Sequence, residues 1–170
     1  MKVVASIVSF VSALCAGCAQ YVPGSLVTAP SGVQYANTLT AGCLDLVVNI
    51  ECSAETRPGA VIVRVDLGNR CDHGTPIDFT QLAVFDGDPR GSMPMAVYDP
   101  RAEIVAGRIA PHGSGLERIE FDRNTPDTDP PQRVCVRAAA MFDATSRAAM
   151  CFDARSPGGC PTTFLGTVDR

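Results

Sequence analysis

The chain has 170 residues, with 14 basic and 18 acidic side chains and a formal net charge of −4. Lys2 is its one lysine, and a surface that is acidic overall lacks the basic stripe that nucleic-acid binding requires. Tryptophan is absent and aromatic residues make up only 6% of the chain, so a core must be built from Val, Leu, Ile and Phe. The length suits one domain.

The first seventeen residues have the order of a secretory signal peptide. Lys2 supplies a positive charge, Val3 to Leu14 is an uncharged and largely apolar run, and small residues follow it. The run is too short to span a bilayer. A buried N-terminal core element is the alternative. We predict a signal peptide at residues 1–17 and therefore an exported protein.

The residues Cys15 to Cys18 (CAGC) resemble a bacterial lipobox, in which cleavage precedes a cysteine that carries diacylglycerol. A lipobox usually has Leu where this chain has Cys15, so ordinary cleavage after Ala19 stays open. We predict lipidation of Cys18, which makes a membrane the first partner and another envelope protein the second. Because Ala19 is not aspartate, the resemblance implies the outer membrane; without the lipid, the protein would be periplasmic or extracellular.

Three regions are predicted after the signal peptide. Residues 18–42 are rich in Gly, Pro, Ser and Thr without a sustained hydrophobic period, which is typical of a flexible tether. Residues 43–154 form the folded domain. Residues 155–170 form a C-terminal tail.

Alternating apolar residues dominate the predicted domain. One face of residues 43–52 carries four apolar side chains, and so does one face of residues 60–71: Leu44, Leu46, Val48 and Ile50, then Val61, Val63, Val65 and Leu67. A Pro-Gly connection between the two runs predicts an antiparallel pair with one solvated face. Further strand-like runs, bounded by turn-forming sequences, occupy residues 77–85, 93–98, 103–109, 116–121, 133–142 and 148–152.

About eight short strands without a convincing amphipathic helix predict an all-β fold, an immunoglobulin-like antiparallel β-sandwich. The best helical candidate, Arg137 to Met150, is interrupted by an Asp-Ala-Thr-Ser turn. Because the core tryptophan of antibody domains is missing, the domain is not of the antibody type. Such sandwiches bind through end loops, here residues 69–76, 86–91 and 122–132.

Five sequence segments carry a resemblance, in the order GCLDL, LGNRCD, YDPRAEI, VCVRA and CFD between Gly42 and Asp153. In this order they resemble uncharacterised secreted lipoproteins of GC-rich Gram-negative, myxobacterial-type bacteria. The resemblance implies an envelope location and supports the sandwich fold. It implies no catalytic residue.

Six cysteines remain after Cys18, and an even number in an oxidising compartment predicts disulfides, with fifteen possible connectivities. A first hairpin that turns near Pro58 brings Cys43 opposite Cys71, although strand alternation then requires a bulge near Gly68-Asn69. A turn centred on Asp143 brings Cys135 opposite Cys151. Elimination leaves Cys52 with Cys160.

No residue is predicted to be catalytic, to bind a metal or to hold a cofactor. One alternative is an envelope hydrolase that uses His73 or His112 with loop carboxylates, and with Ser114 as a nucleophile. A second alternative is a metal-binding module. Copper would use Met93 and Met95 with a histidine, although two methionines at this spacing are expected on one core face.

Calcium would use loop oxygens, and neither candidate loop matches an EF-hand. The candidates are Asp86 and Asp88 in one loop, and Asp122, Asn124, Asp127 and Asp129 in the other. We therefore predict a non-enzymatic envelope lipoprotein whose β-sandwich binds a protein or supports an assembly.

Overall fold

A computed structural model describes residues 20–26, 36–52, 59–90, 92–97, 106–123 and 129–168. In this part of the chain the regular elements are β-strands and two short 3-10 helices, η1 (Phe79–Gln81) and η2 (Ala138–Met141). The prediction of an all-β fold is confirmed. The strands are β1 (Thr38–Ala41), β2 (Leu44–Glu51), β3 (Val61–Asn69), β4 (Thr75–Asp78), β5 (Ala83–Asp86), β6 (Ala96–Val97), β7 (Ala106–Ile109), β8 (Ser114–Asp122), β9 (Arg133–Arg137), β10 (Ala149–Asp153) and β11 (Thr163–Val168).

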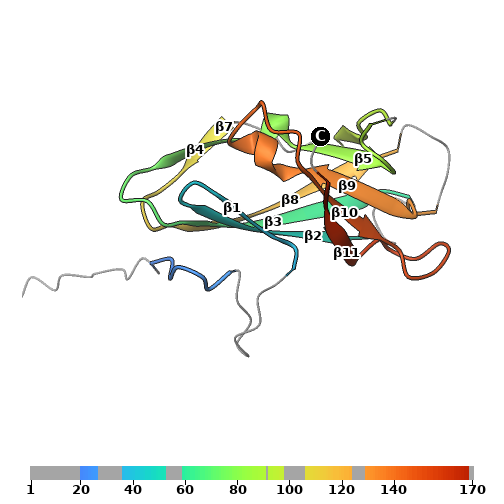
Figure 1. Ribbon diagram of the computed structural model, residues 1–170, viewed down its shortest axis with the longest axis horizontal. Coiled ribbons are helices and arrows are strands. Elements are labelled where there is room, and N and C mark those ends of the chain that lie inside the picture. Colours follow the sequence, from blue (N-terminus) through green and yellow to red (C-terminus); the bar gives the residue numbers. More distant parts are fainter. Residues whose placement is uncertain are drawn as a thin grey trace, which may run out of the picture.

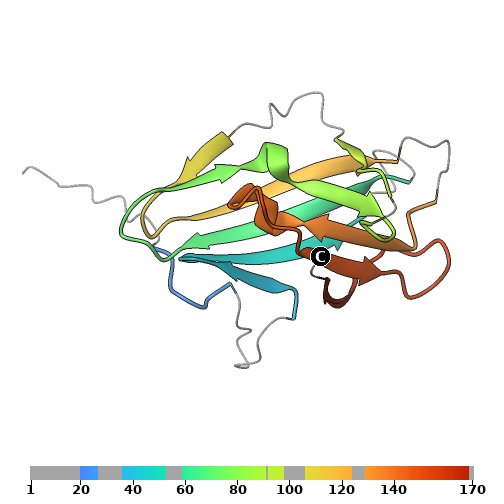
Figure 2. The same cartoon turned by 45° about the horizontal axis from the view of Figure 1, so that its top comes forward.

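The strands form three antiparallel sheets. The first has the order β1-β2-β3-β8-β6, the second has the order β11-β10-β9-β5, and β4 pairs with β7 in a small third sheet. The two larger sheets lie one over the other (Figures 1 and 2). One apolar core fills the space between them, with Val63 and Val65 from β3 against Val134 from β9 and Phe152 from β10.

The register of the first hairpin follows from its hydrophobic pattern. Leu46 lies opposite Leu67, and Ile50 lies opposite Val63, so the alternating apolar residues of both strands face the core. The pairing of β2 with β3 is regular from Leu44 to Glu51. The predicted bulge near Gly68-Asn69 is therefore wrong. No bulge is needed because Cys43 precedes β2 and Cys71 follows β3, where strand alternation no longer applies.

Two of the predicted strands are interrupted by 3-10 helices. Residues 77–85 were predicted as one strand, but η1 separates β4 from β5, which belong to different sheets. Asp78 caps η1 by accepting a hydrogen bond from the backbone N–H of Thr80 at 3.0 Å. The predicted strand at residues 133–142 likewise ends at Arg137, where η2 begins and buries Ala138 and Met141.

Residues predicted as tether and tail contribute strands to the domain. β1 pairs with β2, and its Leu39 packs against the core. β11 pairs with β10, and its Phe164 ring lies 5.4 Å from the Phe152 ring. These short strands are stabilised by pairing with their neighbours along the chain, β2 and β10, rather than by their own composition. Within the described residues, no helix is long and apolar enough to cross a bilayer.

Substitution of Val63 tests which face of β3 is buried. Val63 is completely buried, so Val63→Asp places an unpaired charge in the core and should cost several kcal/mol of unfolding free energy (about 3 or more). The neighbouring Arg64 lies on the opposite face, where it pairs with Asp66 at 2.9 Å. Arg64→Gln should cost less than about 1 kcal/mol. Urea unfolding of both variants measures the difference, and equal losses would show that the assignment of faces is wrong.

Candidate functional site

Two turns meet at one end of the domain, which we call the His112 end. One turn follows β3 at residues 70–74, and the other connects β7 to β8 at residues 110–113. The backbone N–H of His112 donates to the carbonyl oxygen of Cys71 at 3.3 Å, which joins the two turns directly. Both turns lie at the left of Figure 1.

The Asn69 amide also joins these turns, from a position that is fully buried. Its Nδ2 donates to the carbonyl oxygens of His73 at 3.0 Å and of Ala110 at 2.9 Å. Its Oδ1 accepts from the backbone N–H of Cys71 at 2.9 Å and from the hydroxyl of Thr75 at 3.3 Å. One buried side chain thus fixes the turn from β7 into β8 against the turn that follows β3.

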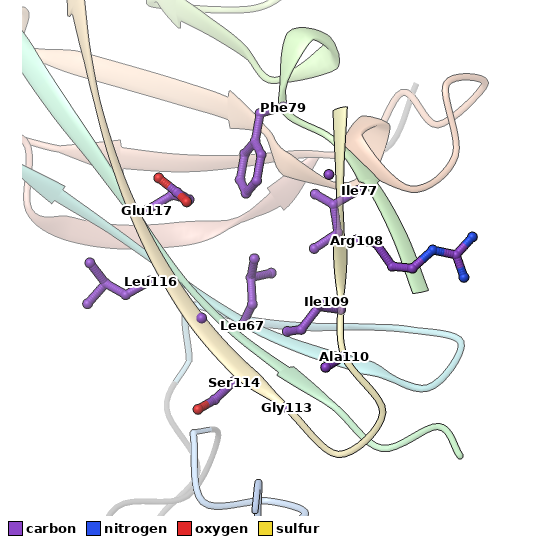
Figure 3. Close-up of a pocket in the computed structure, with 12 residues that line it drawn as sticks. Leu67, Ile77, Phe79, Arg108, Ile109, Ala110, Gly113, Ser114, Leu116 and Glu117 are labelled. Atoms are coloured by element: carbon purple, nitrogen blue, oxygen red, sulfur yellow. The ribbon is translucent and has the colours of Figure 1, made fainter. Parts of the chain in front are cut away.

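A groove separates β7 from β8, although these strands are neighbours in the chain. β7 pairs with β4, and β8 pairs with β3. The space between them has a volume of about 280 Å³, and we call it the β7–β8 groove (Figure 3). Its floor is apolar and continuous with the core, and is formed by Leu67, Ile77, Phe79 and Ile109.

Two strand edges border the β7–β8 groove. On one side β8 pairs with β3 from Ser114 to Phe121, whereas on the other side it pairs with β6 only at Phe121 and Asp122. Among the described residues, no strand therefore pairs with the outer edge of β8 between Ser114 and Ile119. The backbone groups of such an edge can form hydrogen bonds with a further strand.

Glycines leave both borders of the groove open. At Gly107 in β7 and at Gly115 in β8, a β-carbon would have no neighbouring atom within 4 Å. A glycine inside a strand often marks a place where another backbone approaches closely. On the side of β8 that faces away from β7 (Figure 3), the Leu116 side chain is 49% exposed. The groove thus combines an apolar floor, a strand edge that no described strand pairs with, and space for a backbone.

This groove was not expected from the sequence, which pointed to binding in the end loops. Of those loops, residues 69–76 lie at the His112 end beside the groove. The other two loops meet at the opposite end, where the Arg123 side chain donates both to the Asp86 carboxylate and to the carbonyl oxygen of Asp129. The available signal was the glycines at 107 and 115 within strand-like sequences. The pairing of β7 with β4 is a long-range contact that periodicity does not encode.

The candidate catalytic residues form a pair and not a triad. His112 Nε2 lies 2.9 Å from Asp72 Oδ1, and the Asp72 side chain is 96% exposed. Ser114 lines the β7–β8 groove, which neither His112 nor Asp72 does. His73 is exposed, and its carbonyl oxygen accepts from Asn69. The described side chains thus give Ser114 no assembled general base.

The candidate metal ligands are dispersed or paired with arginine. Met95 is buried in the core, as predicted, but the prediction is wrong for Met93, which is 87% exposed. Pro94 between them forms an isolated bridge to Phe85, so strand alternation does not hold there. Asp86 accepts from Arg123 at 2.7 Å, while Asn124 and Asp127 lie outside the described residues. In the described part of the chain, no group of three or more metal-ligating side chains forms.

The cysteines of the domain pair as the sequence predicts. Cys43 and Cys71 close the open end of the first hairpin, with their Cα atoms 5.5 Å apart. The other two pairs are Cys52–Cys160 and Cys135–Cys151, with Cα separations of 5.7 and 4.1 Å. The predicted lipidation site Cys18 and the signal peptide lie outside the described residues.

The chain matches no protein family and no curated protein sequence. Among solved structures, it is similar to the yjhA protein of Bacillus subtilis, with 12% identity, a TM-score of 0.42, and coverage of 64% of this chain and 82% of that one. It is also similar to ycdA, a presumed lipoprotein of Bacillus subtilis subsp. subtilis, with 10% identity, a TM-score of 0.35, and coverage of 80% of this chain and 39% of that one. Similarities at this level assign neither a family nor a function.

Proposed function

We propose that this protein is a non-enzymatic envelope lipoprotein whose β-domain binds an extended segment of another envelope protein in the β7–β8 groove. The observation that carries the proposal is the outer edge of β8, which borders an apolar groove. Between Ser114 and Ile119, no described strand pairs with this edge. An extended peptide can add to such an edge as a further strand.

The groove suits a peptide in which apolar and polar residues alternate. Main-chain hydrogen bonds to β8 would provide affinity, and every second side chain would point toward the floor at Leu67 and Ile109. The glycines at 107 and 115 keep both borders clear for the peptide backbone. On the rim, Glu117 offers a negative charge, whereas the Arg108 side chain extends away from the groove (Figure 3) and donates to the carbonyl oxygen of Gly74 at 2.7 Å.

The strand order supports the immunoglobulin-like class. In constant-type immunoglobulin domains, strands A, B, E and D form one sheet, and strands G, F and C form the other. In this chain β2-β3-β8-β6 has the order A-B-E-D, and β10-β9-β5 has the order G-F-C. β1 and β11 are then additional edge strands, and the β4–β7 pair opens the groove beside strand E.

Lipidation of Cys18 is the part of the proposal that fixes the location. The CAGC sequence at residues 15–18 follows an apolar run, as a lipobox does. Lipid chains on this cysteine would provide stable anchoring. We expect Cys18→Ala to move the protein from the membrane fraction to the soluble fraction, measured by immunoblotting of fractionated cells. A Cys18→Ala protein that still sediments quantitatively with membranes would contradict lipid anchoring.

Site-specific photo-crosslinking tests the groove in cells. Leu116 and Leu165 are matched positions, because both are strand leucines and are 49% and 51% exposed. A photo-reactive amino acid at position 116 should form an adduct with one defined segment of an envelope protein. The same amino acid at position 165, in the second sheet, should not.

A blocking variant strengthens this test. Gly115→Val places a branched side chain in the open groove and adopts strand geometry readily, so the melting temperature should stay the same while the adduct at position 116 disappears. Adducts that form equally at positions 116 and 165, or that survive Gly115→Val, would contradict binding in the groove.

A further inference from the structure

A segment that precedes β1 packs against the first sheet and is hydrogen-bonded to it. Residues 20–26 run beside this sheet (Figures 1 and 2), and the Tyr21 side chain is only 6% exposed. The Tyr21 hydroxyl donates to Asp45 Oδ2 at 2.7 Å, and Arg70 Nε donates to Asp45 Oδ1 at 3.1 Å. We call residues 20–26 the N-terminal strap and the site that receives Tyr21 the tyrosine socket.

The tyrosine socket requires a glycine in β3. A β-carbon at Gly68 would lie 2.3 Å from the nearest atom of the Tyr21 ring, so the ring can occupy this place only because residue 68 has no side chain. The backbone N–H of Tyr21 also donates to the carbonyl oxygen of His112 at 2.6 Å. The strap is therefore attached at the His112 end of the domain by its ring, its hydroxyl and its backbone.

The buried carboxylate makes the socket specific for tyrosine. Asp45 is only 4% exposed on the outward face of β2, and burial of a carboxylate is costly unless charged or polar groups pair with it. Arg70 and the Tyr21 hydroxyl provide these partners. Burial, followed by the hydrogen bond to Asp45 and its negative charge, raises the pKa of Tyr21 to about 12. The hydroxyl thus remains a donor at physiological pH.

The strap shortens the connection between the domain and the proposed lipid. Cys18 precedes Tyr21 by three residues, which span at most about 10 Å when fully extended. A free tether over residues 18–42 would have an end-to-end distance of about 25–30 Å and would permit many orientations.

We infer that the N-terminal strap holds the domain against the membrane in one orientation, with the His112 end toward the lipid surface. The inference rests on the lipidation of Cys18 that is part of the proposed function. The β7–β8 groove begins at Ala110, Gly113 and Ser114, which belong to the same end. A segment bound in the groove would therefore come from a protein close to the membrane surface.

Tryptophan fluorescence can measure this orientation, because the chain contains no tryptophan of its own. Pro111→Trp places a probe in the exposed turn at the His112 end. Pro157→Trp places one in the exposed turn between β10 and β11, a turn that lies at the opposite end of the long axis (Figure 1). The lipidated protein is reconstituted in phosphatidylcholine vesicles that contain lipids brominated near the headgroup. We expect strong quenching of the probe at position 111 and little quenching at position 157.

Gly68→Ala is the matched variant, because it should expel the Tyr21 ring while leaving the lipid site and Asp45 intact. In this variant, the difference in quenching between the two positions should largely disappear. Spectrophotometric titration of the Cys18→Ala protein, with and without Gly68→Ala, measures release of the strap directly. In Gly68→Ala, the pKa of Tyr21 should return from about 12 to its ordinary value of about 10. Because the pKa of Tyr21 is raised in the docked strap, the stabilisation from docking is complete below about pH 10 and is lost as the pH rises toward 12.

The outcomes separate the two claims. Mass spectrometry that finds no lipid on Cys18 would overturn both the lipid anchor and the orientation. A lipidated protein whose two probes are quenched equally, or whose quenching difference is unchanged by Gly68→Ala, would overturn the orientation alone. Preferential quenching at position 111 that depends on Gly68 supports the strap as the orienting element.

Discussion

Replacement of Asn69 with alanine is expected to lower the free energy of unfolding by about 3 kcal/mol, because it removes the hydrogen bonds that one fully buried side chain makes to three backbone groups. The side chain is fully buried and connects the carbonyl oxygens of His73 and Ala110 with the N–H of Cys71. Urea unfolding followed by circular dichroism measures the loss.

Asn49 is the matched control for this prediction. Its side-chain oxygen accepts one hydrogen bond, from Asn37 at 2.9 Å, and its side chain is only half-buried. Asn49→Ala should therefore cost about 1 kcal/mol or less. Similar small losses at both positions would mean that the two turns at the His112 end hold together without the Asn69 amide.

Removal of the Cys52–Cys160 disulfide is expected to have the largest effect among the three bridges. It closes a loop of 108 residues, whereas the other two bridges close 28 and 16 residues. In the chain-entropy account, a bridge stabilises the fold by restricting the unfolded chain. The expected contribution to the free energy of unfolding is about 4.8 kcal/mol for Cys52–Cys160, about 3.6 kcal/mol for Cys43–Cys71 and about 3.1 kcal/mol for Cys135–Cys151. Cys52→Ala/Cys160→Ala should therefore unfold at the lowest urea concentration of the three double variants.

The three double alanine variants serve as controls for one another, because each removes two sulfur atoms from the chain. The Cys52–Cys160 bridge also attaches the segment before β11 to the end of β2. Its loss should expose the amides of β11 to hydrogen exchange before those of β2 and β3. Equal destabilisation by all three double variants would contradict the loop-length explanation.

The sequence contained enough information for the central hairpin and the cysteine pairs. Apolar residues at even positions in β2 and at odd positions in β3 determine which residues can face each other, and this places Leu46 opposite Leu67. The predicted bulge was unnecessary, since it assumed that Cys43 and Cys71 lie within the strands. Cys135 and Cys151 are direct partners across β9 and β10, as the turn near Asp143 indicated.

Periodicity could not predict the elements that depend on contacts outside their own sequence. β1 and β11 are short and gain their order from β2 and β10. Tyr21 had no visible role in the sequence, because its socket is formed by Gly68 and Asp45, far away in the chain. The division of residues 77–85 into β4 and β5 likewise results from their pairing with β7 and β9 in two different sheets.

Hydrogen exchange along β8 tests the proposed binding mode most directly. The segment that crosslinks at position 116 is synthesised as a peptide and added to the isotope-labelled protein, and amide exchange is followed by NMR. We expect new protection at alternate amides between Ser114 and Ile119, those that point away from β3, since β3 already pairs with the other edge. Protection that appears only in the loops at the opposite end, with the exchange of β8 unchanged, would contradict binding by strand addition in the β7–β8 groove.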